Sequence, residues 1–373
     1  IAGIFLVRTK EGAGMSQLLK SLGRGVNFSA LLIGVLTFVI LYTLNIENWL
    51  GISFSVIAGL VAGVIIGQST EYYTSHSYKP TQRISESGQT GPATVIISGI
   101  GLGMISTAIP VITIGVAIII AYCSAINFDI TNMMTAKNIG MGLYGIGIAA
   151  VGMLSTLGIT LATDAYGPIA DNAGGNAQMS ELDPEVRKRT DVLDALGNTT
   201  AATGKGFAIG SAALTALALL ASYLEEIKIG LAHIGQTTLD VAGRVVNVAE
   251  ATIPDMMEYY QVNLMNPKVL IGAFIGAMMS FLFCGLTMNA VGRAAQKMVE
   301  EVRRQFREIP GILAGKATPD YAKCVEISTK GAQSEMLFPS LLAIAVPVIV
   351  GLIFGVHGVM GLLVGGLASG FVL

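Results

Sequence analysis

Two polar runs lie between apolar stretches near the middle of this chain, and they carry the side chains best suited to chemistry. The first run holds Asp164 and Asp171, and the second holds Asn198 and Lys205. The members of each pair are close to two helical turns apart, so each pair would share one face of a continuous helix. Pro168, between the aspartates, is expected to distort that turn. A hairpin of the two helices would bring two carboxylates, an amide and an ammonium group together.

This set of groups suits a ligand made of magnesium and phosphate. Carboxylate oxygens suit Mg²⁺, which keeps several waters and is often shared with substrate phosphates. The Lys205 ammonium suits a phosphate as a compact point charge. From residue types alone, however, a structural salt bridge or a proton relay explains the set equally well.

The composition is that of a polytopic membrane protein. Of 373 residues, 53% are hydrophobic and 12% are charged, and the mean hydropathy is +0.68. The stretches without a charged residue are 25–46, 48–70, 87–128, 138–163, 206–224, 269–292 and 336–373. Most reach the roughly 20 residues that a spanning helix needs, and the last is long enough for two helices that break at Gly355–Gly358. We predict an all-α polytopic transmembrane helix bundle with about seven complete spans and partial helices at both ends.

The two ends of the chain lie within apolar sequence, and the first residue is not methionine. We interpret the chain as an internal fragment of a longer protein. Residues 1–373 would then form a single transmembrane domain that is incomplete at both ends.

Basic residues are sorted between alternate loops. Most of the 22 Lys and Arg fall on one side, in loops 8–25, 70–92, 163–200 and 292–336. By the positive-inside rule these loops are cytoplasmic. Ionisable groups at a membrane boundary are costly and by default mark a substrate or ion site, so the polar runs predict such a site at the cytoplasmic face. We expect a multi-pass protein of a bacterial plasma membrane.

Small residues inside the apolar stretches indicate close helix packing. Glycine accounts for 46 residues, many of them in the predicted spans. Pro110 and Pro347 lie inside apolar helices and should kink them. By contrast, the three Cys and three His are scattered, so they predict neither a disulfide framework nor a zinc site.

Two polar segments are long. The segment 225–265 contains an amphipathic stretch over 239–253 that would lie on the membrane or cap the bundle. After Gly292, the spacing of Met298, Val302 and Phe306 predicts that the preceding span continues as a charged helix. A role of this segment in binding anionic lipid or substrate is the alternative interpretation.

Several sequence blocks resemble the membrane-integral pyrophosphatases, pumps that hydrolyse pyrophosphate and move protons or sodium. The blocks are TEYYTS at 70–75, DAYGPIADNAGG at 164–175, RTDVLD at 189–194, GNTTAATGKGFAIGSAA at 197–213 and KMVEEVRRQF at 297–306. The resemblance covers essentially the whole chain, and the block at 197–213 is highly specific.

The resemblance implies a homodimer of sixteen-helix subunits, of which this chain would span the end of the seventh helix to part of the fifteenth. It implies that Lys205, Asn198 and Glu71 bind or lie near the substrate and that Asp171 and Asp164 contribute to its magnesium site. The family's other acidic motifs, which hold most magnesium ligands and position the attacking water, have no counterpart here. We therefore assign no catalytic residue within this chain and expect it to be inactive alone.

The resemblance also bears on potassium. Family members that work without potassium carry lysine where Ala201 stands, and the residue at Gly204 usually differs with it. Because Ala201 supplies no charge, a potassium ion is expected to fill the gap. A small residue that merely permits close helix packing is the alternative interpretation.

The resulting hypothesis is a membrane-bound pyrophosphatase that couples hydrolysis of magnesium-pyrophosphate to translocation of protons or sodium. The expected cofactors are magnesium and potassium, and the expected partners are pyrophosphate, the lipid bilayer and a second copy of the subunit, with no nucleic acid. The residues alone also allow a secondary transporter of an organic anion that uses Asp164 and Asp171 as an intramembrane carboxylate pair.

Overall fold

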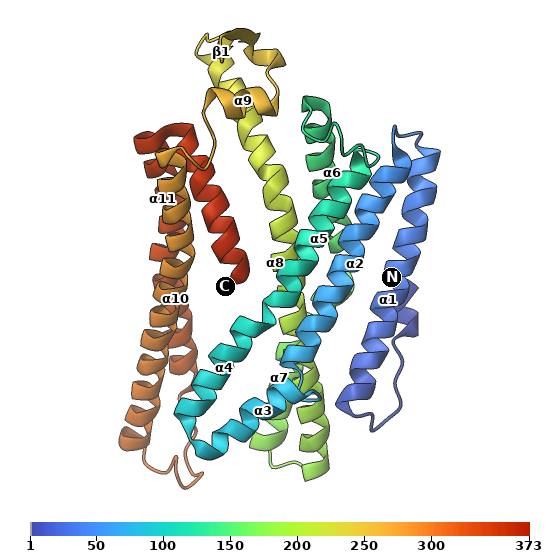
Figure 1. Ribbon diagram of the computed structural model, residues 1–373. Helices are drawn as coiled ribbons and strands as arrows, with labels where there is room; N and C mark the ends of the chain where they lie inside the picture. Colours follow the sequence, from blue (N-terminus) through green and yellow to red (C-terminus); the bar gives the residue numbers. More distant parts are fainter. Residues whose placement is uncertain (1) are drawn as a thin grey trace. The chain divides into compact units, whose positions relative to one another are not determined.

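The computed structural model describes residues 2–373, and Figure 1 shows that they are almost entirely helical. Among these residues, seven helices are long and apolar enough to cross a membrane. Both observations confirm the predicted all-α polytopic bundle. The chain forms two compact units, one extending to Leu239 and including 245–256, the other comprising 240–244 and 257–373. The prediction of a single domain over 1–373 stays a prediction.

The first unit contains most of the helices. Its elements are η1 (Ala2–Leu6), α1 (Met15–Thr43), α2 (Trp49–Thr74), α3 (Lys79–Ser87), η2 (Gly88–Thr90), α4 (Pro92–Ser106), α5 (Ala108–Ala125), α6 (Ala136–Leu154), α7 (Leu157–Met179) and α8 (Pro184–His233). Between α4 and α5 the helix is interrupted at Thr107, one turn before Pro110. Proline removes a helical hydrogen bond and clashes with the preceding turn, so the interruption falls where the predicted kink should be.

Helix α2 is the best enclosed of the apolar helices, and glycine explains how. A Cβ atom on Gly59 would lie 1.8 Å from the carbonyl oxygen of Ala149 in α6, and one on Gly51 would lie 2.1 Å from that of Ser124 in α5. The Ser55 hydroxyl donates to the Ala121 carbonyl at 2.8 Å. Helix backbones therefore meet directly, which only glycine permits, as the sequence predicted for these spans.

Polar segments predicted as loops are mostly helical. Helix α7 continues to Met179 and α8 begins at Pro184, so little of the segment 163–200 is loop. Asp183 caps α8 by accepting a hydrogen bond from the Glu185 backbone at 2.8 Å, and Pro184 occupies the first helical turn. A helix forms its own backbone hydrogen bonds both inside and outside the membrane. It therefore need not end where the sequence changes from apolar to polar. The cytoplasmic side of 8–25, 70–92, 163–200 and 292–336 stays a prediction.

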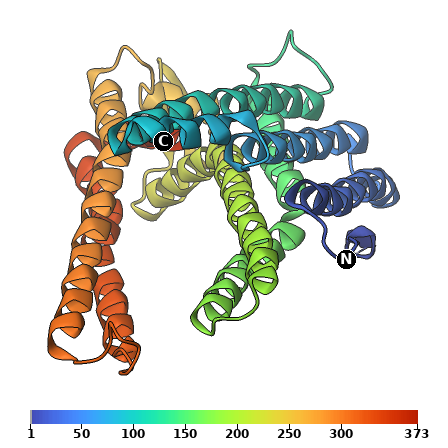
Figure 2. The ribbon, with the colours of Figure 1, turned by 90° about the horizontal axis from the view of Figure 1, so that it is seen from below.

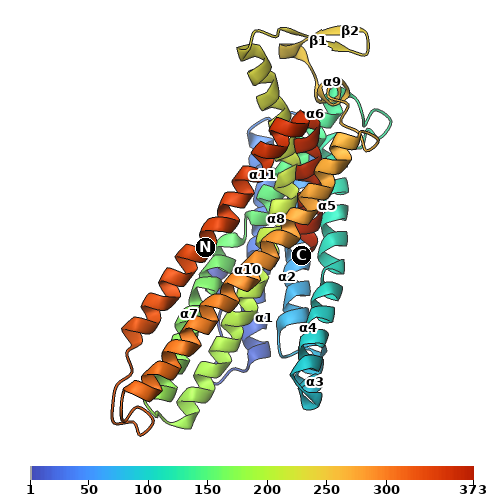
Figure 3. The same cartoon turned by 90° about the vertical axis from the view of Figure 1, so that its left-hand side faces the viewer.

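The second unit is built on two long helices that run side by side, α10 (Pro267–Glu308) and α11 (Tyr321–Val372), as Figures 2 and 3 show. Helix α10 extends past Gly292, which confirms the predicted charged extension. Helix α11 is broken at Gly355, whose φ of 71° and ψ of −162° are not helical. The predicted break at Gly355–Gly358 is thus confirmed, because this backbone conformation favours glycine.

Beyond Gly355 the chain doubles back and packs against the start of α10 (Figure 1). A Cβ atom on Gly361 would lie 2.0 Å from the Val269 carbonyl oxygen, and one on Gly365 would lie 2.0 Å from that of Ala273. Small residues again let two helix backbones touch.

The amphipathic stretch in 239–253 contains a short hairpin rather than a helix along its length. Strands β1 (Thr238–Val241) and β2 (Arg244–Asn247) are followed by η3 (Val248–Glu250) and α9 (Ile253–Tyr259). Ala242 and Gly243 at the turn both have positive φ, which suits a two-residue hairpin turn. Leu239 and Val241 are buried and alternate with exposed neighbours. The apolar side chains therefore repeat every two residues, as in a strand with one buried face.

Candidate functional site

Helices α7 and α8 form a tightly packed antiparallel hairpin that carries the two polar runs. A Cβ atom on Gly197 would lie 2.6 Å from the Cα atom of Gly167, so the backbones meet at these two glycines. The Thr200 hydroxyl donates to the Thr163 carbonyl at 3.5 Å. Nearer the hairpin tip, the Arg187 guanidinium donates to the Gly174 carbonyl. These contacts determine which face of each helix meets the other.

The four polar residues predicted from the sequence project to one side of this hairpin. Asp164 and Asp171 share a face of α7, and Asn198 and Lys205 share a face of α8, since each pair is about two turns apart. Each face lies beside the contact with the other helix. Because the helices are antiparallel, the helical phase turns both faces to the same side.

Pro168 does not interrupt α7, but it changes the surroundings of Asp164. The helix is continuous from Leu157 to Met179 with Pro168 inside it. Proline has no N–H group, so the Asp164 carbonyl, one turn earlier, loses its usual helical donor. The half-buried Asp164 therefore offers a backbone oxygen as well as its carboxylate. Both are ligand types that a hard cation accepts.

Most of these charged groups have no partner within the part of the chain described. Within residues 2–373, the carboxylates of Asp164 and Asp171 and the ammonium of Lys205 form no hydrogen bond or ion pair. Asp171 and Lys205 are exposed. Asn198 differs, because its amide donates to Asp194 at 3.2 Å.

Asp194 is a further candidate site residue that was not predicted from the sequence. It lies one turn before Asn198 on α8, and the hydrogen bond to it orients the Asn198 amide. The i,i+4 spacing between Asp194, at the end of the block 189–194, and Asn198, in the block 197–213, was the signal that could have identified it.

The carboxylates do not form a ready-made metal cage. Within residues 2–373, no three or more His, Cys, Asp or Glu side chains are arranged to hold a metal ion. Magnesium does not require such a cage, because it is commonly held by one or two carboxylates together with waters and substrate phosphates. The donor set on the hairpin therefore fits magnesium only together with a phosphate ligand or with further residues.

Ala201 and Gly204 lie on α8 between Asn198 and Lys205. Ala201 is half-buried and about one turn from both, so a longer side chain at Ala201 would emerge beside the Lys205 ammonium. Gly204 is buried, and a Cβ atom there would lie 3.6 Å from the Thr160 methyl group of α7. Position 204 thus faces α7, whereas position 201 borders the polar face.

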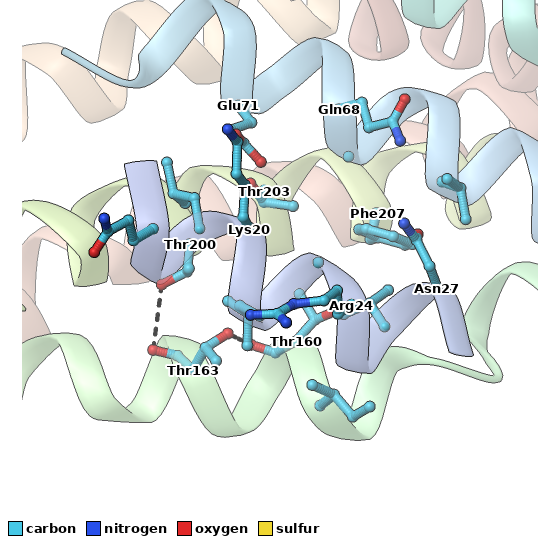
Figure 4. Close-up of a pocket in the computed structure, with 18 of the residues that line it drawn as sticks. Lys20, Arg24, Asn27, Gln68, Glu71, Thr160, Thr163, Thr200, Thr203 and Phe207 are labelled. Carbon is cyan, nitrogen blue, oxygen red and sulfur yellow. Dashed lines mark hydrogen bonds between the residues drawn. The ribbon is translucent and has the colours of Figure 1, made fainter. Parts of the chain in front are cut away.

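Glu71 lies elsewhere, in a cavity of about 750 Å³ on the other side of the hairpin (Figure 4). Helices α1, α2, α7 and α8 line this cavity, and α8 contributes Thr200, Thr203 and Phe207. Those residues are roughly half a turn around α8 from Asn198 and Lys205. The structure therefore brings four of the predicted residues to one face and leaves Glu71 apart from them.

Comparison with known proteins identifies the family. The family model described as inorganic H+ pyrophosphatase matches residues 1–373. This chain belongs to that family of membrane-integral pyrophosphatases, as the sequence blocks indicated. With seven apolar helices and bacterial relatives, it is a multi-pass protein of the plasma membrane.

Individual relatives carry more specific names. A Bacteroides thetaiotaomicron protein is 68% identical over all of this chain and 50% of its own length, and it bears the provisional name K(+)-stimulated pyrophosphate-energized sodium pump. The K(+)-stimulated pyrophosphate-energized sodium pump of Thermotoga maritima is 44% identical over 86% of this chain and 39% of its own length. The K(+)-insensitive pyrophosphate-energized proton pump 2 of Moorella thermoacetica is 40% identical over 100% of this chain and 50% of its own. The chain thus spans about half the length of the curated relatives it matches.

Proposed function

We propose that this chain supplies part of a pyrophosphate-energised ion pump, which hydrolyses magnesium-pyrophosphate and moves protons or sodium ions across the membrane. The observation that carries the proposal is the polar face of the α7–α8 hairpin, where Asp164, Asp171, Asn198 and Lys205 project to one side. The names of the relatives support the substrate and the transport activity. They give no support to the alternative, a secondary transporter of an organic anion.

Each residue on this face has a task that its chemistry suits. Lys205 offsets charge on a phosphate, and Asp171 and Asp164 hold magnesium directly or through water. Asn198, oriented by Asp194, donates or accepts a further hydrogen bond. Magnesium, when bound, neutralises phosphate charge. The substrate role predicted for Glu71 has no comparable support, because Glu71 lies on the other side of the hairpin.

The remaining ligands and the groups that position water would come from the other half of the protein. We therefore assign no catalytic residue here and expect the chain alone to be inactive. A homodimer of complete subunits, which the family resemblance implies, is part of the same proposal.

The test of the assignment is the Lys205→Ala variant in the complete protein. Loss of one charge-assisted contact should raise the magnesium-pyrophosphate concentration for half-maximal hydrolysis by roughly 10- to 100-fold. Lys137→Ala is the matched control, because Lys137 is an exposed lysine on α6, away from the hairpin. Equal kinetics for the Lys205 variant and the control would remove Lys205 from the site.

Potassium stimulation is the second part of the proposal. Ala201 brings no charge to the polar face beside Lys205, so a potassium ion from solution would take the place that a lysine ammonium takes in potassium-independent members. The names of the Bacteroides and Thermotoga relatives, both K(+)-stimulated, support this. Ala201→Lys should make hydrolysis independent of potassium, whereas Ala201→Leu, which adds bulk without charge, should not. Persistent potassium stimulation in Ala201→Lys would contradict the proposal.

The polar face would lie at the cytoplasmic side. A single cysteine at Ser180, in the α7–α8 turn, should react with an impermeant maleimide only after the cytoplasmic face is opened. Labelling of this cysteine in intact cells would contradict the cytoplasmic assignment and indicate the opposite orientation in the membrane.

A further inference from the structure

The cavity between α1, α2, α7 and α8 has two basic side chains at one end, and the acidic residues of its lining do not balance their charge. Lys20 and Arg24 lie one turn apart on α1, and both are exposed. In the described residues, neither side chain takes part in a hydrogen bond or an ion pair. The lining contains a single acidic residue, Glu71, so the two basic groups exceed the acidic ones. Figure 4 shows these three side chains around the same space.

Glu71 already has a partner. The Tyr78 hydroxyl donates a hydrogen bond to the Glu71 carboxylate at 3.0 Å. Burial, and then this hydrogen bond, raise the pKa of Tyr78, so the hydroxyl keeps its proton and remains a donor. The Tyr78 hydroxyl therefore partly satisfies the Glu71 carboxylate. Lys20 and Arg24 remain available to bind an anionic ligand that enters the cavity.

The rest of the lining is mixed, with polar side chains such as Asn27 and Gln68 beside apolar ones. Arg24 immediately precedes the charge-free stretch 25–46, and Glu71 immediately follows the stretch 48–70. The lining residues Val26, Val64 and Phe207 fall inside charge-free stretches. The cavity therefore extends from the level of the membrane boundary into the level of the hydrocarbon core.

The size and lining of the cavity distinguish between possible anions. Its volume of about 750 Å³ is in the range of sites for drug-sized ligands and well above what a single phosphate group fills. A free phosphate would also leave the apolar part of the lining, which includes Val26, Val64 and Phe207, without a function. Basic pockets between spanning helices on the cytoplasmic side commonly hold anionic lipid headgroups.

We propose that this cavity binds an anionic phospholipid, with its phosphate between Lys20 and Arg24 and the first part of an acyl chain along Val26, Val64 and Phe207. The buried Thr160 of α7 and the half-buried Thr203 of α8 supply hydroxyl groups at the wall. This lipid site is separate from the proposed pyrophosphate site, because the two lie on opposite sides of the α7–α8 hairpin. It does not depend on hydrolysis, so its failure and that of the proposed function are distinguishable.

The first experiment removes the two charges. The complete protein, stripped of lipid in detergent, is titrated with phosphatidylglycerol, and bound lipid is counted by native mass spectrometry. The double variant Lys20→Gln/Arg24→Gln should bind on the order of 30-fold more weakly, since each basic residue contributes a similar attraction to an anionic headgroup. Lys79→Gln/Arg83→Gln is the matched control, because Lys79 and Arg83 are an exposed Lys and Arg one turn apart on α3, outside the cavity. Wild-type binding by the first double variant would overturn the proposal.

A second variant blocks the cavity without changing charge. Gly23 lines the cavity, and a Cβ atom there would have no neighbour within 4 Å, so Gly23→Phe can be accommodated and would occupy space that the lipid needs. It should also lose phosphatidylglycerol. Two other outcomes contradict the lipid assignment: equal binding of zwitterionic phosphatidylcholine, or displacement of phosphatidylglycerol by inorganic phosphate.

Discussion

Two helical hairpins in this chain carry many charged residues, and the polar face of the α7–α8 hairpin differs from the α10–α11 hairpin in how its charges are paired. On α10 and α11 the charges outside the apolar stretches are largely matched: Arg293 binds Glu335 at 2.5 Å, and Glu326 accepts from Lys330 at 2.5 Å and from Lys323 at 3.0 Å. On α7 and α8, the carboxylates of Asp164 and Asp171 and the ammonium of Lys205 take no part in such pairs within the described residues.

The difference indicates which charges have a structural task. Paired charges on α10 and α11 join neighbouring turns and neighbouring helices, so their function is met within the protein. The unpaired charges lie together on one face next to apolar sequence, and no contact within the described residues stabilises them. A ligand that supplies the missing partner would account for them. Pairing thus accounts for the charges that it joins on α10 and α11, whereas Asp164, Asp171 and Lys205 are unpaired and also share one side of the α7–α8 hairpin, which makes them candidate ligand residues.

The largest expected effect tests this distinction directly. In the complete protein, Asp171→Ala should lower magnesium-dependent hydrolysis by about 10- to 100-fold or more, because a magnesium contact is lost. Glu326→Ala is the matched control: it removes a paired surface carboxylate, and such pairs contribute little, so hydrolysis should change by less than about twofold. Similar losses for the two variants would show that pairing does not distinguish functional from structural charges.

A smaller effect tests the packing that holds the α7–α8 faces in place. Gly197→Ala should destabilise the protein by about 1–3 kcal/mol, because the new Cβ atom would lie 2.6 Å from the Gly167 Cα atom. Gly230→Ala, on the same helix, meets no atom within 4 Å and should stabilise by up to about 1 kcal/mol through helix propensity. Thermal unfolding of both variants gives the answer, since shifts of the same sign would contradict the close contact of the two helices.

The smallest effect concerns the paired charges near the end of α10, beyond its apolar stretch. Glu301 is only 7% exposed, and hydrogen bonds from Arg304 and then Gln305 lower its pKa from 4.5 to about 2. Its contribution to stability is therefore complete above about pH 4.5 and is lost as the pH falls toward about 2. Glu301→Gln should unfold at a lower temperature than wild type at neutral pH, and the gap should close on acidification. A gap that is constant with pH would mean that the carboxylate charge does not matter.

The sequence by itself determined the class of fold and the identity of most of the hairpin's polar residues. Long charge-free stretches predict spanning helices because a membrane leaves no other way to satisfy the backbone. The break at Gly355 was predictable for a similar reason, since glycine at the end of an apolar helix favours a turn. The nearly two-turn spacing of Asp164 and Asp171 also placed both on one helical face before any tertiary contact was known.

Which faces are buried was decided only by the tertiary structure. On the charged end of α10, the spacing of Met298, Val302 and Phe306 predicted the helix but not its buried face, since Val302 and Phe306 are exposed. Glu301 and Gln305 are buried instead, because the Gln305 amide donates to the Asp320 carbonyl at 3.0 Å and accepts from its N–H at 2.8 Å, at the start of α11.

The same applies to Glu71. Glu71 and Lys205 both belong to the sequence blocks of the family, but the phase of α8 puts Lys205 on one side of the hairpin and the cavity containing Glu71 on the other. Asp194, by contrast, shares a face of α8 with Asn198 through its i,i+4 position, so local periodicity places it there. Periodicity within one helix fixes which residues share a face, whereas the neighbour that each face meets depends on contacts between segments far apart in the chain, and local sequence does not encode them.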